Sequence, residues 1–293
     1  MKRLSKSMVG CFMAAVMMMT VGCQKEEIAP IIPDSPIVPE GWLPGLFSVS
    51  ATKQVHFSQG NLQYQASTNT WRFAEHQYDY VGTQTPDRYG YYGGNVSGSD
   101  NSNISSTYSG WIDLFGWGTG DNPTLASMYD ADYSTFVDWG CNPISNGGNA
   151  AHLWRTLTNA EWYYLLEGRP NASSKFATGN INGVGGLIIL PDNWTQPSEC
   201  AFTSGFAPDW TLNSYTLAQW EQMEDAGAVF LPAAGERSGA YVVYAGRFGI
   251  YWSSDPTDES RAFRMGFSSD INDLGNPFNN RNTGYSVRPV QDK

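Results

Sequence analysis

The sequence predicts one α+β domain of many short strands and two short helices. Three observations lead to this prediction. Hydrophobic residues make up 41% of the chain and aromatic residues 14%, which is enough for a large core and excludes a disordered chain. Short apolar segments bounded by Gly, Pro, Asn or Ser recur along the sequence, as strands do. Two segments carry clear start signals of helices.

The amino-terminal segment is typical of an export signal. Basic residues between Lys2 and Lys6 precede an uncharged apolar run, Met8 to Gly22, which is shorter than the roughly 20 residues of a membrane-spanning helix. We therefore expect residues 1–22 to be a signal peptide. The following Cys23 completes a segment that resembles a bacterial lipobox, although Thr20 stands where Leu is usual. The resemblance implies that Cys23 is acylated and anchors the mature chain to a membrane; an ordinary secretory signal with an incidental Cys is the alternative.

A tether is expected between this anchor and the domain, over residues 23–44. Proline recurs there at every third position from Pro30 to Pro39, which is the repeat of a polyproline II helix and favours a semi-rigid spacer. No second linker interrupts the sequence after this segment. We therefore expect residues 45–293 to form one domain.

Nine short segments have the composition of strands. They are Phe47 to Ser50, Gln54 to Phe57, Leu62 to Tyr64, Trp71 to Phe73, Leu187 to Leu190, Val229 to Leu231, Tyr241 to Tyr244, Ala262 to Phe267 and Ser286 to Val290. In the eighth segment, Phe263, Met265 and Phe267 alternate with Arg264 and Gly266. This period of two predicts a strand that is buried on one face.

The two predicted helices begin with the same device. Thr158 and Thr216 are each followed three residues later by Glu or Gln, which forms a capping box that satisfies two backbone N–H groups of the first turn. In each case an apolar residue just before the cap is spaced to pack on a tryptophan, Trp162 or Trp220. We expect both tryptophans to be buried packing residues rather than ligand contacts.

Several segments resemble known families. Residues 153–164, which contain the first capping box, resemble the signature that opens the first helix of formylglycine-generating-enzyme-like domains. Carboxyl-terminal segments are similar to the Fibrobacter succinogenes major paralogous domain family, which shares a C-type-lectin-like fold with those enzymes: residues 229–235, 251–254 and 284–290. Residues 57–64 and 111–118 look like the version found in exported Bacteroides-type lipoproteins. The resemblance implies a C-type-lectin-like domain over essentially all of residues 46–290.

The motifs of enzymes are missing from the sequence. Formylglycine-generating enzymes use a closely spaced cysteine pair in the carboxyl-terminal half, and this chain has no cysteine after Cys200. His56, His76 and His152 are isolated, and neither a nucleophile elbow nor a phosphate-binding loop is present. We therefore expect no catalytic activity, with a degenerate relative of the formylglycine-generating enzymes as the alternative.

Cofactors and nucleic acids are not expected either. Cys141 and Cys200 fit no zinc spacing, although in an exported protein the two are free to form a disulfide, and the sequence leaves this open. Asp270 begins a segment like a calcium loop, but Arg281 takes the position of the bidentate Glu. A lectin-type calcium site that uses Asp255, Asp258, Glu259 or Asp270 stays open. The formal net charge of −11 disfavours contact with a phosphate backbone.

The stretch from Arg237 to Arg281 has the composition of recognition loops. Tyr, Arg and Asn are interleaved with Gly there. Tyr offers rigid contact area, Arg offers forked donors and Asn offers adaptable hydrogen bonding. We predict that the ligand-binding residues are Tyr241, Tyr244, Arg247, Asp255, Asn279 and Arg281.

These inferences combine into a functional hypothesis. We expect a lipid-anchored lipoprotein of the outer membrane or cell surface that acts as a non-catalytic binding module for a glycan or a protein. A structural component of a surface or fimbrial assembly is a further alternative.

Overall fold

The computed structural model describes residues 40–82, 101, 104–239, 241–269 and 278–293. The chain divides into two units, Met1–Ile37 and Val38–Lys293, and every described residue belongs to the second. The predicted signal peptide, Cys23 and most of the predicted tether therefore lie outside the described residues. Leu43 is only 2% exposed, so packing of the folded unit begins slightly before residue 45.

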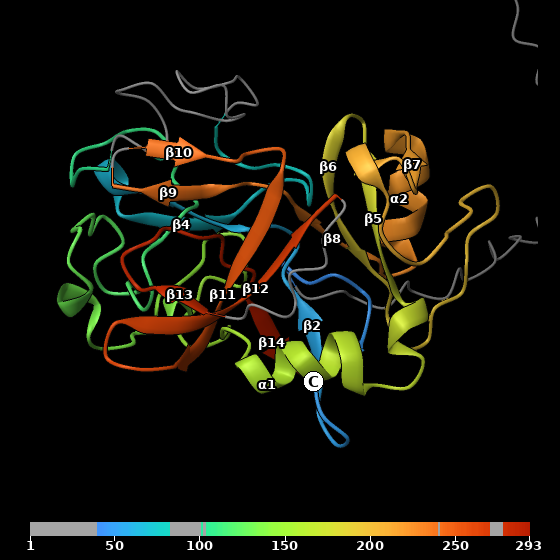
Figure 1. The fold of residues 1–293 in the computed structure, drawn as a ribbon, viewed down its shortest axis with the longest axis horizontal. Helices are drawn as coiled ribbons and strands as arrows, with labels where there is room; N and C mark the ends of the chain where they lie inside the picture. Colours follow the sequence, from blue (N-terminus) through green and yellow to red (C-terminus); the bar gives the residue numbers. More distant parts are fainter. Residues whose placement is uncertain (1–39, 83–100, 102–103, 240, 270–277) are drawn as a thin grey trace, which may run out of the picture. The chain divides into compact units, whose positions relative to one another are not determined.

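Small sheets make up most of the described fold (Figure 1). One sheet has the order β1-β2-β14 and joins strands from both ends of the domain: β1 (Phe47–Ser48), β2 (Gln54–Phe57) and β14 (Val290–Asp292). A four-stranded sheet has the order β7-β5-β6-β8: β5 (Phe176–Ile181), β6 (Val184–Ile189), β7 (Ser214–Tyr215) and β8 (Val229–Pro232). A third has the order β11-β12-β13: β11 (Phe248–Pro256), β12 (Arg261–Ser268) and β13 (Phe278–Asn280). Two hairpins complete the strands: β3 (Leu62–Gln65) with β4 (Thr70–Phe73), and β9 (Glu236–Ser238) with β10 (Tyr241–Val243).

The described residues contain two short α-helices, α1 (Asn159–Tyr163) and α2 (Leu217–Asp225). Helix α1 continues directly into a π-helical turn, η5 (Tyr164–Gly168). Single 3-10 turns link other segments: η1 (Ala66–Thr68), η3 (Asp130–Tyr133), η4 (Trp139–Cys141), η6 (Ala172–Ser174) and η7 (Pro208–Trp210). Mixed sheets with two short helices confirm the predicted α+β class.

Both predicted capping boxes are formed. The Thr158 hydroxyl accepts a hydrogen bond from the Glu161 backbone N–H at 3.1 Å, and the Glu161 carboxylate accepts one from the Thr158 N–H at 3.0 Å. Thr216 and Gln219 repeat the arrangement at the start of α2. The expected burial of the two tryptophans is also confirmed, since Trp162 is 3% and Trp220 is 2% exposed. The expectation that neither contacts a ligand stays a prediction.

The β11–β12 hairpin separates two apolar cores. Met265 and Phe267 of β12 pack in one core with Phe57 and Trp162. The alternate residue Ala262 belongs to the other core, which also holds aromatic residues of β3, β4 and β11: Tyr64, Trp71, Phe73 and Trp252. The prediction that β12 is buried on one face is therefore wrong, because packed side chains cover both faces.

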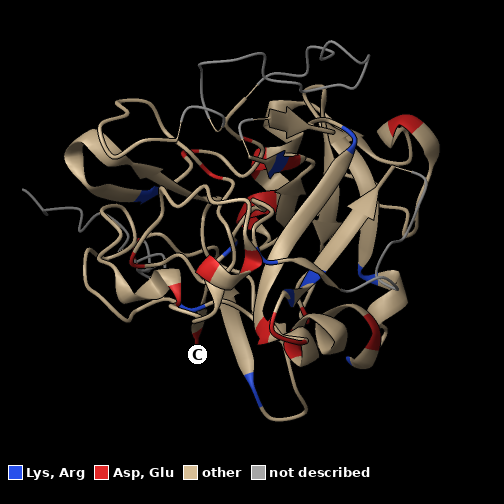
Figure 2. Cartoon of the chain, turned by 60° about the vertical axis from the view of Figure 1, so that its left-hand side comes forward, with Lys and Arg blue, Asp and Glu red and all other residues tan. Residues whose placement is uncertain are grey.

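Charged residues are sparse on the folded unit, and most of the ribbon in Figure 2 is neither acidic nor basic. Several of the charges are paired near the carboxyl terminus. Arg155 contacts Glu161 and Asp292, each at 2.7 Å, and Lys53 contacts the same two carboxylates at 3.4 and 3.3 Å. This group ties β14 to the first turn of α1.

Candidate functional site

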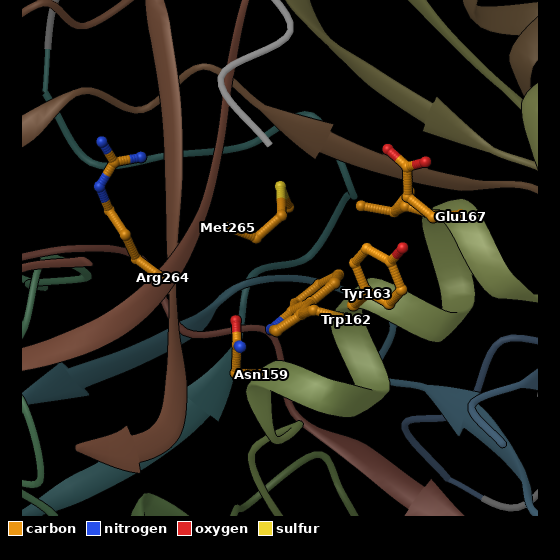
Figure 3. Close-up of a pocket in the computed structure, with 7 residues that line it drawn as sticks. Asn159, Trp162, Tyr163, Glu167, Arg264 and Met265 are labelled. Atoms are coloured by element: carbon orange, nitrogen blue, oxygen red, sulfur yellow. The ribbon is translucent and has the colours of Figure 1, made fainter. Parts of the chain in front are cut away.

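A small pocket lies where α1 and η5 meet strand β12 (Figure 3). Its volume is about 140 Å³. The side chains that line it are Asn159, Trp162, Tyr163, Leu166, Glu167, Arg264 and Met265. In Figure 3 the helical residues lie on one side of the pocket, and Arg264 and Met265 lie on the other.

The helical side of the pocket follows from local sequence. Asn159, Trp162, Tyr163, Leu166 and Glu167 are spaced i, i+3, i+4, i+7 and i+8, so one face of the helix presents all five. The capping box starts this helix, and its first turn is tied further to β11 because the Asp255 carboxylate accepts the Asn159 N–H at 2.9 Å. The helix then widens into η5, and π-helical turns occur frequently at functional sites.

Trp162 contributes both to the core and to the pocket. Its ring packs against Phe57 with a centroid distance of 6.0 Å. Its indole Nε1 is buried and has no hydrogen-bond partner among the described residues. In Figure 3 the nitrogen lies at the end of the ring nearest Asn159. Trp162 therefore packs in the core and lines the pocket, while its indole nitrogen is sealed from solvent.

The remaining side chains divide into an apolar floor and a polar rim. Leu166 and Met265, which are 2% and 3% exposed, form the apolar floor of the pocket. Tyr163 is 66% exposed, and Glu167 is exposed beside it. The rim therefore offers an aromatic surface and a carboxylate acceptor that solvent or a ligand reaches directly.

On the strand side, the Arg264 side chain points away from the helical residues of the pocket (Figure 3). Burial raises the pKa of the neighbouring Glu236 carboxyl, and a hydrogen bond from Tyr285 and the charge of Arg264 partly oppose this rise. The Tyr285 hydroxyl donates to Glu236 at 3.3 Å, and burial raises the pKa of Tyr285 in turn. The Arg264 charge therefore acts on the half-buried Glu236 carboxyl rather than inside the pocket.

Three of the sequence-predicted binding residues lie in the segment from the start of β10 to the turn before β11. Tyr241 is 52% exposed and Arg247 is exposed, as expected of loop residues. Tyr244 is half-buried, with a left-handed backbone at φ 62° and its ring 5.2 Å from that of Phe248. Tyr244 and Arg247 share the β10–β11 turn, where the Arg247 N–H donates to the Tyr244 carbonyl, whereas Tyr241 begins β10. The role of all three in binding stays a prediction.

The side chains of the other three predicted residues make hydrogen bonds within the fold. Asp255 caps α1, as described above, and the Asn279 amide donates to the Tyr285 hydroxyl. Arg281 is only 5% exposed and lies over the Trp117 ring, 4.4 Å from its centroid. Its guanidinium donates to the carbonyl oxygens of Tyr133, Ser134 and Asp258. The expectation that Arg281 is an exposed loop residue is therefore wrong.

The cysteines and the acidic residues considered for ion binding are placed as follows. Cys141 and Cys200 are both free, so the disulfide that the sequence left open is not formed in this structure. The Asp258 carboxylate is engaged by Arg261 at 2.7 Å, and Asp270 lies outside the described residues. Across the described ranges, no group of three or more His, Cys, Asp or Glu side chains is arranged to hold a metal ion.

Comparisons with protein-family models, with curated proteins and with solved structures found no match for this chain. The helices in the described part of the chain are all too short or too polar to cross a membrane.

The sequence analysis missed the pocket itself. The helical spacing from Asn159 to Glu167 was available as a signal, because it places two aromatic and two polar side chains on one face. No local sequence pattern indicated the strand side of the pocket. Arg264 and Met265 lie about a hundred residues further along the chain, and their approach to α1 depends on the packing of β12 against that helix.

Proposed function

We propose that this chain is a non-catalytic glycan-binding module of C-type-lectin-like fold, held at the cell envelope by a lipid on Cys23. The observation that carries the binding role is the pocket between α1, η5 and β12. Aromatic, apolar and hydrogen-bonding side chains converge there on a space of about 140 Å³.

The chemistry of the pocket suits a sugar. A pyranose ring has C–H faces that pack on aromatic rings, and its edge carries hydroxyl groups that both donate and accept hydrogen bonds. Tyr163 offers exposed aromatic surface at the rim. Asn159 and Glu167 supply amide and carboxylate groups, which suit hydroxyls.

The size of the pocket restricts how much of a glycan it holds. Clefts for drug-sized ligands have volumes of roughly 300–1,000 Å³. This pocket is smaller, so we expect it to hold one sugar unit while the rest of the glycan lies on the exposed surface around Tyr163.

A glycan array probed with the purified full chain tests the proposal. Tyr163→Ala and Glu167→Gln should each weaken binding at least about tenfold, because both side chains are exposed at the rim. Tyr241→Ala and Arg247→Ala are matched control variants with exposed side chains, on β10 and in the β10–β11 turn. Loss of binding in the control variants alone would move the site to that segment, and an array with no bound glycan would refute the proposal.

A further inference from the structure

Glu167 is an exposed carboxylate without a partner at the rim of the pocket. It lines the pocket, yet it makes no hydrogen bond or ion pair with any other described residue. Glu161 lies six residues earlier on the same helix and differs in this respect, because Arg155 pairs with it at 2.7 Å and Lys53 at 3.4 Å. A ligand at the rim therefore meets a carboxylate whose charge is not neutralised by an ion pair in the described part of the chain.

The position of Glu167 on the helix adds to the negative potential. Helix α1 and η5 run without a break from Asn159 to Gly168, so Glu167 lies in the last turn. The carbonyl end of a helix carries partial negative charge, which favours cations and disfavours carboxylates there. The residues of the last turn, Tyr164–Gly168, include no Lys, Arg or His. The helix end and the carboxylate therefore both favour a cation at this part of the rim.

The basic side chains nearest in the sequence or the pocket are engaged elsewhere. Arg264 points away from the helical residues, and its charge acts on Glu236. Arg169 follows Glu167 by two residues, but its side chain is fully buried and pairs with Asp192 at 3.1 Å. Glu167 therefore sets the sign of the charge at the rim.

Tyr163 places an aromatic ring one helical turn before this carboxylate. Residues four apart lie on the same face of a helix, and in Figure 3 the two side chains lie next to each other on the helical side of the pocket. The C–H face of a sugar packs on such a ring. A cationic substituent of that sugar is attracted both by the carboxylate and by the face of the ring.

We propose that the pocket selects an amino sugar whose amino group is free and protonated, with the ammonium donating to Glu167 and the sugar ring beside Tyr163. This inference rests on the proposed glycan-binding function. An ammonium has three donors and no acceptor, and an ionised carboxylate only accepts, so the two groups are complementary.

Other sugar substituents match this rim less well. A hydroxyl or an acetamido group donates to Glu167 without a charge, and hydrogen bonds between ionised partners are roughly twice as strong as neutral ones. The carboxylate of an acidic sugar has the same charge as Glu167 and is repelled. The affinities should therefore follow the charge of the sugar, from positive through neutral to negative.

The first test titrates the unmodified full chain with four methyl glycosides, those of glucosamine, N-acetylglucosamine, glucose and glucuronic acid, followed by NMR at about pH 6, where the amine is protonated. We expect glucosamine to bind about tenfold more tightly than the two neutral sugars and glucuronic acid to bind most weakly. Equal affinity of glucose or N-acetylglucosamine would overturn the amino-sugar inference and leave glycan binding intact. Absence of binding to all four sugars and to the array would instead refute the proposed function.

The second test changes the charge of the rim at an exposed position, where the fold tolerates substitution. Glu167→Gln keeps the shape of the side chain, and the preference for glucosamine over glucose should fall to about twofold or less. Glu167→Lys should make glucuronic acid the tightest of the four sugars. Glu221→Gln is the matched control, because Glu221 is an exposed Glu on α2 outside the pocket. A preference that persists in Glu167→Gln, or that falls equally in Glu221→Gln, would overturn the assignment.

A lysine side chain of a protein presents the same ammonium without a sugar ring. Nα-acetyl-lysine amide is therefore a fifth probe, and we expect it to bind more weakly than glucosamine, because its flexible chain loses more conformational entropy on binding than a rigid ring does. Binding of this probe as tight as that of glucosamine would indicate a protein ligand and overturn the amino-sugar inference.

Free amino sugars occur in deacetylated chitin and in deacetylated bacterial cell-wall polymer, which share the ammonium group. Soluble fragments of the two polymers, titrated side by side, separate these sources. Binding of either fragment that weakens in Glu167→Gln supports the inference, whereas binding that is unchanged in this variant contradicts it.

Discussion

Asp192 connects three segments of the fold through one carboxylate. One of its oxygens accepts hydrogen bonds from the Ser48 backbone N–H and hydroxyl at 2.7 Å and from the Gln54 amide at 3.0 Å. The other pairs at 3.1 Å with Arg169, whose side chain is fully buried. The carboxylate thus holds the β1–β2 hairpin against the segment that follows η5.

Asp192→Asn should lower the free energy of unfolding by about 3 kcal/mol, because it leaves the buried Arg169 charge without its counter-ion. Urea denaturation measures this change. The control Asp225→Asn alters an exposed residue at the end of α2 and should change stability by less than about 0.5 kcal/mol. Equal effects of the two variants would contradict the role assigned to Asp192.

The same residue predicts how stability depends on pH. Burial alone would raise the pKa of Asp192, but hydrogen bonds from Ser48 and Gln54 and the charge of Arg169 outweigh it and hold the pKa below the usual 3.8. The stabilisation is therefore complete above pH 3.8 and is lost as pH falls through the lowered folded-state pKa. Thermal unfolding from pH 6 to pH 2 should show a smaller acid destabilisation for Asp192→Asn than for the unmodified chain. Parallel curves for the two proteins would contradict this linkage.

Helix α1 both stabilises the fold and lines the pocket, and comparison with α2 separates these two roles. Both helices begin with a Thr capping box, but α1 alone of the two lines the pocket. Thr158→Ala and Thr216→Ala should each cost about 1 kcal/mol in the free energy of unfolding, as loss of a cap usually does. Glycan affinity, measured by calorimetry, should fall in Thr158→Ala and stay unchanged in Thr216→Ala. An equal fall in both variants would mean that binding follows global stability rather than the position of α1.

The helices and strands also differ in how well the sequence predicted them. The capping boxes fixed the starts of α1 and α2 because capping is local, and each box lies within four residues. Strand β11 escaped prediction because its apolar residues, Ile250, Tyr251 and Trp252, are consecutive and pack on both faces, which removes the alternation of a half-buried strand. Strand β14 begins at Val290, whereas the predicted strand covered Ser286 to Val290, because Ser286 makes only an isolated bridge to Tyr251.

The binding loops were predicted from composition, and composition does not distinguish exposed Arg and Asn from buried ones. Arg281 and Asn279 belong to a region rich in Tyr and Gly, yet the structure uses them to satisfy carbonyl and hydroxyl groups inside the fold. The pocket in turn needs long-range packing that no local pattern describes. Sequence reasoning therefore reached the fold class and the helix starts, but not the pocket between α1 and β12.

For the whole molecule, the proposal places the folded unit at the end of a lipid-anchored tether. Cys23→Ser should abolish incorporation of a labelled fatty acid and shift the protein from the detergent phase to the aqueous phase, because the acylated thiol is gone. Phase partitioning of cells fed the labelled fatty acid measures both effects. Cys11→Ser is the control, since Cys11 lies within the predicted signal peptide and should leave labelling unchanged. Label that persists in Cys23→Ser would refute the lipid anchor.

The central claim, that a glycan binds between α1 and β12, is tested most directly by the crystal structure of the full chain with the glycan that the array identifies. We expect one sugar unit in the pocket, with its ring beside Tyr163. A sugar seated instead on Tyr241 of β10 and Arg247 of the following turn, or an unoccupied pocket at a sugar concentration that saturates binding in solution, would contradict the claim.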